Sequence, residues 1–161
     1  MASNDDSQPL FRNRYRVAPA RWSRWDYRRP GFYHVTICTQ CRIRCLGEVV
    51  GSGVVLSPYG EVVAREWRQI PRRHPQVTLD ESIVMPDHLH GLLILGGLES
   101  LPLGGIIGQF KAKVTKVVRS LGHSEFAWQE RFHDTIVENL KELNRIRQYI
   151  RDNPKRWQSK R

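Results

Sequence analysis

The sequence predicts an α+β domain, in which an antiparallel sheet packs against helices in the manner of a ferredoxin-like sandwich. Short segments rich in β-branched and aromatic residues alternate with longer segments whose apolar residues recur at helical spacing. In chain order they run strand, hairpin, helix, strand, strand, helix, strand, helix, which is typical of the α+β class. The length of 161 residues suits one compact domain with a sizeable core.

The expected strands are separated by residues that favour turns. Gly51-Ser52-Gly53 lies between two valine-rich runs and predicts a hairpin. Pro86 and Asp87 separate two further β-rich runs. The expected strands cover residues 32–39, the two arms of a hairpin within 46–56, and residues 77–85, 88–95 and 132–137.

Three segments are predicted to be helices. Ser57 is a suitable N-cap and Pro58 fits a first turn, so the first helix should begin there and end before Pro71. The second helix shows apolar residues at helical spacing, with its lysines away from that stripe. The third should end at Pro154, because the residue before a proline disfavours the helical conformation. The expected helices cover residues 58–70, 106–121 and 138–153.

The charge balance favours a polyanionic partner. The chain has 26 Lys and Arg against 16 Asp and Glu, which gives a net charge of +10. These charges are spread among aromatic residues rather than concentrated on one amphipathic segment, so DNA or RNA is favoured over a membrane surface. No apolar run approaches the length of a membrane span, and the polar start of the chain does not resemble a signal peptide. A solvated basic surface without a partner is the simplest alternative.

Residues 1–29 are expected to form a basic, aromatic arm before a domain at 30–157 and a short basic tail at 158–161. Arginines alternate with aromatic residues in the arm, which suits phosphate contact and base stacking. An arm that merely packs on the domain is equally compatible with this pattern. The candidate DNA-binding residues are Arg21, Arg24, Arg28 and Arg29 of the arm, with Lys111, Lys113, Lys116 and Arg119 on the basic face of the second helix.

Cys38, Cys41 and Cys45 lie close together in the sequence. An odd number of cysteines argues against disulfides in a reducing compartment. A structural zinc site would need a further ligand pair at fixed spacing, which the sequence does not contain. We therefore expect free thiols.

The strongest chemical signal is a pair of histidines, His88 and His90, on one predicted strand. Residues two apart on a strand point to the same face, about 6.5–7 Å apart along the backbone. Leu89 then points into the core, and the two imidazoles can bind one divalent cation. Two polar residues at the end of a strand, without a ligand, are the alternative.

Tyr149 is the best candidate nucleophile. On the last helix it lies about 120° from the centre of the apolar stripe, so it can reach past the core. Asn153 follows one turn later on the same side, and its amide oxygen is a plausible ligand for the same cation. A helical tyrosine in this position is otherwise a packing residue.

Several motifs together resemble a known family, the insertion-sequence-200-like single-tyrosine transposases, and most of all their REP-associated tyrosine transposase branch. The similarity extends over about residues 25–157. The segments that carry it are Thr36–Thr39, Leu79–Glu81, Met85–Gly91, Ile107–Lys111, Trp128-Gln129, Phe132–Asp134 and Tyr149–Pro154.

This resemblance implies a ferredoxin-like HUH domain, in which His88 and His90 are the HUH histidines, Tyr149 is the nucleophile and Asn153 is the third metal ligand. It implies Mg²⁺ or Mn²⁺ as cofactor and single-stranded DNA with hairpins as substrate. Some relatives share tyrosines between the subunits of a homodimer, whereas the REP-associated branch can act as monomers. Asp87 stands where many relatives have Asn, and strand alternation would point it away from the ligand face. The implied location is the bacterial cytoplasm, with nucleoid association when DNA is bound.

The resulting hypothesis is a metal-dependent endonuclease and strand transferase, a transposase that forms a 5′-phosphotyrosine at hairpin-flanked sites. No general base is evident, although His34 and His133 are candidate neighbours that also suit structural roles. One alternative is a domesticated hairpin-binding protein without cleavage. Another is a nickase of the relaxase or replication-initiator type, although such enzymes usually have longer chains.

Overall fold

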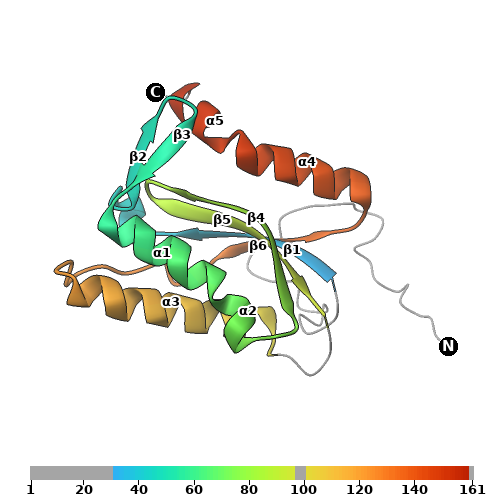
Figure 1. Ribbon diagram of the computed structural model, residues 1–161, viewed down its shortest axis with the longest axis horizontal. Coiled ribbons are helices and arrows are strands. Elements are labelled where there is room, and N and C mark those ends of the chain that lie inside the picture. The colour runs from blue at the N-terminus through green and yellow to red at the C-terminus, as the bar shows by residue number, and fades with distance from the viewer. Residues whose placement is uncertain (1–30, 97–100, 160–161) are drawn as a thin grey trace.

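The centre of the structure is a four-stranded antiparallel sheet, described for residues 31–96 and 101–159 in a computed structural model (Figure 1). The strands lie in the order β4-β5-β1-β6. Their bounds are β1 Gly31–Cys38, β4 Val77–Met85, β5 His88–Leu95 and β6 His133–Val137.

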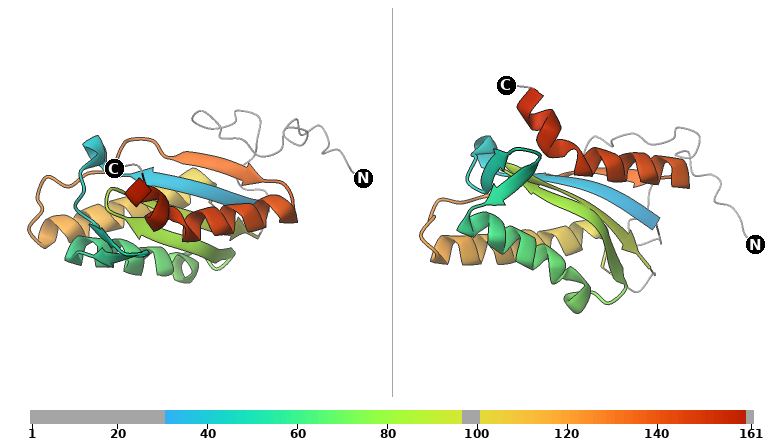
Figure 2. Two further views of the ribbon diagram at one scale, coloured as in Figure 1. Left: turned by 90° about the horizontal axis from the view of Figure 1, so that it is seen from above. Right: turned by 45° about the horizontal axis from the view of Figure 1, so that its top comes forward.

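The helices form a layer on each face of this sheet (Figures 1 and 2). Both crossovers, β1-α1-β4 and β5-α3-β6, skip one strand and place their helices on the same face. This is the ferredoxin-like split βαβ arrangement, so the predicted α+β class is confirmed. The remaining elements are the 3-10 helix η3 Gln40–Arg42, β2 Gly47–Val50, β3 Gly53–Leu56, α1 Pro58–Arg68, α2 Ile70–Arg73, α3 Leu103–Ser120, α4 Leu140–Arg151 and α5 Asn153–Ser159.

The main core lies between the sheet and the α1–α3 layer. Tyr33 of β1, Trp67 of α1 and Phe110 of α3 are almost fully buried there. Side chains of this size contribute roughly 1.5–3 kcal/mol each when buried. Gly91 of β5 faces Trp67, and a Cβ atom at position 91 would lie 2.3 Å from the indole. The absence of a side chain at this position therefore allows α1 to pack closely against β5.

The opposite face of the sheet is only partly covered. Helix α4 packs on it through a smaller apolar cluster. The uncovered part carries polar residues of β1, β5 and β6, among them four histidines. The apolar cluster consists of Leu92, Val137, Leu143, Ile146 and Ile150, with Phe32 and Ile83 against it.

Two prolines do not act as the sequence predicted. Helix α1 ends at Arg68, and Pro71 lies in the first turn of the separate helix α2. Helix α4 ends at Arg151, and Pro154 is the second residue of α5. Both helices thus end within two residues of the expected positions, but each proline begins a further short helix, because proline is tolerated in a first turn, where its missing N–H has no intrahelical partner. The second proline turns the chain toward the β2–β3 hairpin (Figure 1).

The other expected elements are present with small shifts. Ser57 caps α1 by accepting a hydrogen bond from the backbone N–H of Gly60 at 3.1 Å. The hairpin turns at Gly51, which has a φ of 62° that suits glycine. Helix α3 begins at Leu103, three residues before the expected start. The cysteines are free thiols, as expected.

Candidate active site

A cavity of about 670 Å³ opens on the uncovered part of the sheet, beside α4. Four predicted site residues line it together: His88, His90, Tyr149 and Asn153. They come from β5, α4 and the start of α5, which meet only through the tertiary fold.

Strand β5 presents its two histidines side by side. The ring centroids of His88 and His90 are 4.8 Å apart, and each residue is 6% exposed. Leu89, between them, is fully buried in the main core. The alternation predicted for this strand is therefore confirmed.

Each of these imidazoles uses its Nδ1 atom to contact a neighbouring polar side chain. Nδ1 of His88 lies 2.6 Å from a carboxylate oxygen of Asp87. Nδ1 of His90 lies 3.0 Å from the Thr36 hydroxyl and 3.3 Å from Nε2 of His34. Such contacts fix the ring orientation and leave Nε2 as the nitrogen that can bind a metal.

Burial keeps part of this histidine cluster neutral. It lowers the pKa of His34 to about 4. Burial, followed by the neighbouring His88 and His34, lowers the pKa of His90 to about 2. Neutral imidazole is the form that binds metal ions, so near pH 7 His90 needs no deprotonation before it can act as a ligand.

Asp87 lies against the imidazole of His88 instead of pointing away from it, which corrects the sequence-based expectation. It lies in the turn before β5, so the alternation of the strand does not apply to it. Arg42 donates from Nε and Nη2 to its two carboxylate oxygens, at 3.0 and 3.3 Å. Burial raises the pKa of Asp87, but hydrogen bonds and charges of His88 and Arg42 outweigh burial and lower it. The aspartate is therefore an anionic partner for His88.

The Arg42 side chain starts from an unusual backbone. Arg42 and the preceding Cys41 both have positive φ angles, of 54° and 56°. Non-glycine residues rarely adopt this conformation, which tends to persist where the surrounding structure holds it. The guanidinium also donates from Nη1 to the Cys38 sulfur at 3.0 Å. This tight turn thus directs a cation toward the carboxylate beside His88.

Tyr149 lies at the mouth of the cavity, 37% exposed. Its ring centroid is 5.4 Å from that of His90 and 6.3 Å from that of His34. The guanidinium carbon of Arg156 is 4.9 Å from the centroid of the phenol ring. The phenol ring therefore contacts a histidine ring and has a cation beside it.

Two ion pairs hold the tyrosine helix on its own sheet. Arg147 of α4 donates to Asp80 of β4 at 2.6 Å, and Arg151 donates to Glu81 at 2.9 Å. The apolar cluster under α4 also holds this helix on the sheet. Tyr149 therefore reaches the histidines of its own chain.

Asn153 is 7% exposed and begins α5 at the edge of the cavity. Its amide nitrogen donates to the backbone carbonyl of Tyr149 at 3.3 Å, which leaves the amide oxygen as an acceptor. In the described part of the chain no three His, Cys, Asp or Glu side chains are grouped to hold a metal ion. The two imidazole nitrogens and the amide oxygen are the groups of this cavity that could together hold a divalent cation.

The structure adds residues to the site that the sequence did not single out. Arg42, Arg156 and Trp157 line the same cavity. His34 and His133, which were considered only as candidate neighbours, line it as well. For the histidines a signal existed, because His34 lies two residues before Thr36 on β1 and therefore shares its face. The other three depend on contacts between distant segments.

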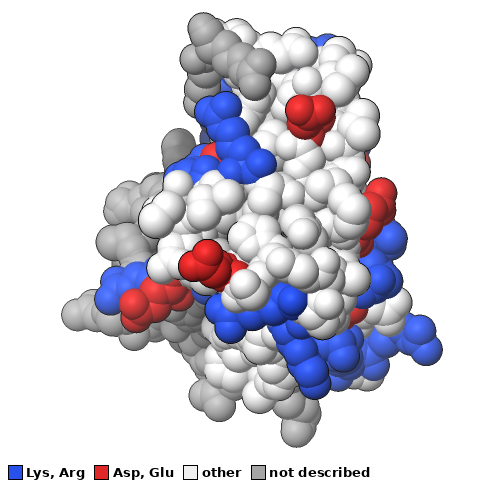
Figure 3. All heavy atoms as spheres, turned by 90° about the vertical axis from the view of Figure 1, so that its left-hand side faces the viewer, with Lys and Arg blue, Asp and Glu red and all other residues white. Residues whose placement is uncertain are grey.

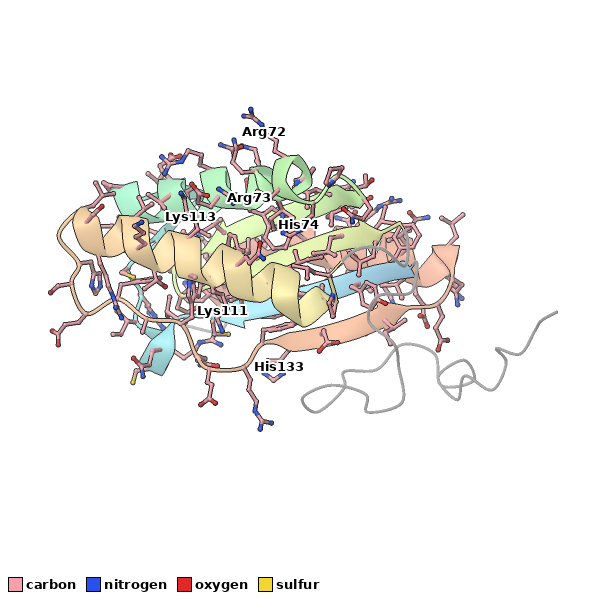
Figure 4. The ribbon with its side chains drawn as sticks, turned by 90° about the horizontal axis from the view of Figure 1, so that it is seen from below. Arg72, Arg73, His74, Lys111, Lys113 and His133 are labelled. Atoms are coloured by element: carbon pink, nitrogen blue, oxygen red, sulfur yellow. The ribbon has the colours of Figure 1, made fainter. Side chains whose placement is uncertain are left out.

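The predicted DNA-binding lysines lie elsewhere. Helix α3 covers the face of the sheet opposite the cavity, and Figure 4 labels Lys111 and Lys113 on it. Lys111 donates to the backbone carbonyl of Gln129 at 2.7 Å, and Arg119 donates to that of Phe126 at 2.9 Å. These two cations thus fasten α3 to the following loop, while Lys113 and Lys116 are exposed. Figure 3 shows Lys and Arg gathered on the lower part of the surface.

Arg21, Arg24, Arg28 and Arg29, the other DNA-binding candidates, lie outside the described residues. Among the described helices, none is long and apolar enough to cross a membrane.

Comparison with known proteins gives the chain its relatives. No family model matches it. An uncharacterized protein from Haemophilus influenzae is 31% identical over 158 residues, which cover 86% of this chain and 88% of the relative. This identity, over most of both chains, makes the two proteins members of one family.

Two solved structures share the fold. One is a REP-associated tyrosine transposase bound to a REP hairpin, with a TM-score of 0.66 and 19% identity over 85% of this chain and 73% of the other. The second is a candidate transposase from Deinococcus radiodurans R1, with a TM-score of 0.54 and 17% identity over 81% of this chain and 94% of the other. The chain therefore belongs to the same family as the Haemophilus influenzae protein, and its fold is that of the REP-associated tyrosine transposase.

Proposed function

We propose that this protein is a metal-dependent transposase that cuts and rejoins single-stranded DNA through Tyr149. The observation that carries the proposal is the phenol ring of Tyr149 at 5.4 Å from the ring of His90, inside one cavity with His88 and Asn153. This juxtaposition joins a nucleophile to a donor set for a divalent cation. The hairpin-bound transposase with the same fold supports DNA as the substrate, as does the net charge of +10.

His88, His90 and Asn153 would hold the cation, which is expected to be Mg²⁺ or Mn²⁺. When bound, it would polarise the scissile phosphate and neutralise the charge that develops there. The chain's own part is to hold the two imidazoles in fixed orientations through Asp87 and Thr36.

The proposed reaction is an in-line displacement at phosphorus. The Tyr149 oxygen forms a bond to phosphorus and loses its proton, while the bond to the 3′ oxygen breaks and that oxygen leaves as a hydroxyl. The products are a 5′-phosphotyrosine and a free 3′ end. Attack by another 3′-hydroxyl on the phosphotyrosine reverses the step and joins strands, because the phosphoester bond has been conserved.

Activation of the phenol is the chemical difficulty, since an ordinary tyrosine pKa is near 10. The guanidinium of Arg156 lies against the phenol ring, where its positive charge can offset the charge of the phosphate under attack. His34, with a pKa of about 4, is a weak base near neutral pH. We therefore assign Arg156 to charge stabilisation; the Tyr149 proton passes to solvent, and the departing 3′ oxygen takes up a proton from solvent.

The test is a covalent-capture assay with single-stranded oligonucleotides that carry hairpins from repeats flanking the gene. A label at the 3′ end should move with the protein on a denaturing gel, because the 5′-phosphate becomes attached to Tyr149. A label at the 5′ end should appear in a shorter free fragment. Both signals should require Mg²⁺ or Mn²⁺ and disappear in Tyr149→Phe.

Tyr59→Phe is the matched control, because this tyrosine lies on α1, where its ring packs edge-on against His123. It should retain the adduct. An adduct that persists in Tyr149→Phe would contradict the assignment. Tight hairpin binding by the wild-type protein, with no adduct in either metal, would favour a binding protein without cleavage.

A further inference from the structure

Trp157, on the last described turns of the chain, is a large aromatic residue that neither apolar core uses. It lies on α5 and is half-buried. In the described part of the chain, the two clusters of buried apolar residues and the side chains packed against them do not include it. Its position is therefore not explained by packing of the core.

The indole lies between the candidate active site and a cation. Its ring centroid is 6.2 Å from that of His88, with the two planes tilted by 35°. The guanidinium carbon of Arg44 lies 4.9 Å from the centroid of the indole. Trp157 and Arg44 thus present two planar groups beside a proposed metal ligand, an arrangement on which another planar group can stack.

A second cavity, of about 270 Å³, begins at the same indole. Trp157 lines both this cavity and the active-site cavity, so the two are neighbours. Drug-sized ligands occupy cavities of roughly 300–1,000 Å³. The volume therefore suits one small planar group better than an extended ligand. Its other lining residues are Arg44, Gly47, Glu48, Val49, Val50 and Pro86.

The lining of this second cavity favours a neutral ligand. Arg44 contributes one positive charge and Glu48 one negative charge, and the other lining residues are apolar or glycine. A phosphate would be repelled by Glu48, whereas the exocyclic amino group of a nucleobase can donate to its carboxylate. Aromatic and guanidinium groups are the usual stacking partners of unpaired bases.

We propose that Trp157 and Arg44 form a stacking site for the nucleobase adjacent to the scissile phosphate of single-stranded DNA. Glu48 selects a base with an exocyclic amino group, such as adenine or cytosine, over thymine. The inference rests on the proposed function, because it places the scissile phosphate in the neighbouring cavity. It adds a site for a base to a protein whose proposed chemistry concerns the phosphate alone.

The experiment combines protein variants with abasic substitutions along a cleavable oligonucleotide. Dissociation constants are measured by fluorescence anisotropy in EDTA, so that neither cleavage nor metal affects them. Stacking on an aromatic residue contributes about 1–3 kcal/mol per base, which is about 5- to 150-fold in affinity. Trp157→Ala should weaken binding of the intact strand within this range, and Trp157→Phe should retain most of it.

When the base that stacks on Trp157 is replaced by an abasic site, the loss of affinity caused by Trp157→Ala should disappear. At that position the wild-type protein should lose the same factor, and Trp157→Ala should add no further loss. Arg44→Ala, an exposed position that leaves the core intact, should show a smaller loss with the same dependence on position. The slope of affinity against salt concentration should be unchanged in Trp157→Ala, because no phosphate contact is removed. Gln158→Ala, on the next exposed position of α5, is the matched control.

The stacking site would be overturned if, at every abasic position, the loss of affinity from the abasic substitution simply added to the loss from Trp157→Ala or from Arg44→Ala. If the wild-type protein still forms the Tyr149 adduct in that case, only this inference fails. If the wild-type protein neither binds single-stranded DNA nor forms an adduct, the proposed function fails with it. An equal affinity for oligonucleotides with thymine or cytosine at the critical position would remove the role given to Glu48.

Discussion

The carboxylate of Asp87 lies 2.6 Å from Nδ1 of His88, while Arg42 donates two hydrogen bonds to the same carboxylate. A carboxylate in this position fixes the tautomer of an imidazole and raises its basicity as a metal ligand. The relationship therefore connects a backbone turn with two positive φ angles to the proposed metal site.

Asp87→Ala should weaken Mn²⁺ binding by roughly 10–100-fold, because the His88 ring loses the partner that orients it. Asp87→Asn should have a smaller effect, since an amide oxygen can still accept from Nδ1. Isothermal titration with Mn²⁺ checks this directly. Glu61→Gln, on the far helix layer, is the control and should bind as the wild type does. Unchanged affinity in Asp87→Ala would show that His88 needs no such partner.

Arg156→Ala should slow formation of the Tyr149 adduct by about two- to fivefold, which corresponds to a cation–π contact of roughly 0.5–1 kcal/mol at an exposed site. Single-turnover rates of adduct formation measure the effect. Lys155→Ala removes a neighbouring charge that does not line the cavity, and its rate should stay close to that of the wild type.

Gly91→Ala should destabilise the fold by about 1–3 kcal/mol, because the added Cβ would meet the Trp67 indole at 2.3 Å. Gly108→Ala is a matched change in α3, where nothing lies within 4 Å of the added carbon. It should stabilise the protein by roughly 0.5–1 kcal/mol. Chemical denaturation of both variants separates the two outcomes, and equal effects would mean that the contact at position 91 relaxes without cost.

Asp80→Asn should lower the unfolding free energy by about 0.5–1 kcal/mol near pH 7. Hydrogen bonds from Arg147 lower the pKa of Asp80, so the folded state favours the carboxylate. Stability from a lowered carboxylate pKa is present above the unfolded pKa and is lost as the pH falls through the folded one. The difference between variant and wild type should therefore shrink below about pH 4. Glu125→Gln, which changes an exposed carboxylate in the same way, is the control variant for this comparison.

Local sequence patterns predicted much of this fold because they report which side of an element is buried. Alternation placed His88 and His90 on one face and Leu89 on the other, as the structure has them. The helical period placed Tyr149 on the flank of its helix, where it is 37% exposed. These predictions needed only the geometry of a single element.

Contacts between distant segments could not be predicted from the residue pattern of a single element. The expected direction of Asp87 was wrong because a turn, unlike a strand, has no fixed alternation. Pro71 and Pro154 were expected to end helices, whereas each lies in the first turn of a new one. The turn at Pro154 brings Trp157 beside His88, which no pattern within the last helix indicates.

The proposed metal ligands and the tyrosine all belong to one polypeptide, and the tyrosine helix is fastened to its own sheet by two ion pairs. A proposed active site that lies within one chain does not depend on association with a second subunit at low protein concentration. The initial rate should rise in direct proportion to protein concentration down to nanomolar levels, without the steeper dependence of an enzyme whose subunits must first meet. A cell holding a handful of copies would then already possess working molecules.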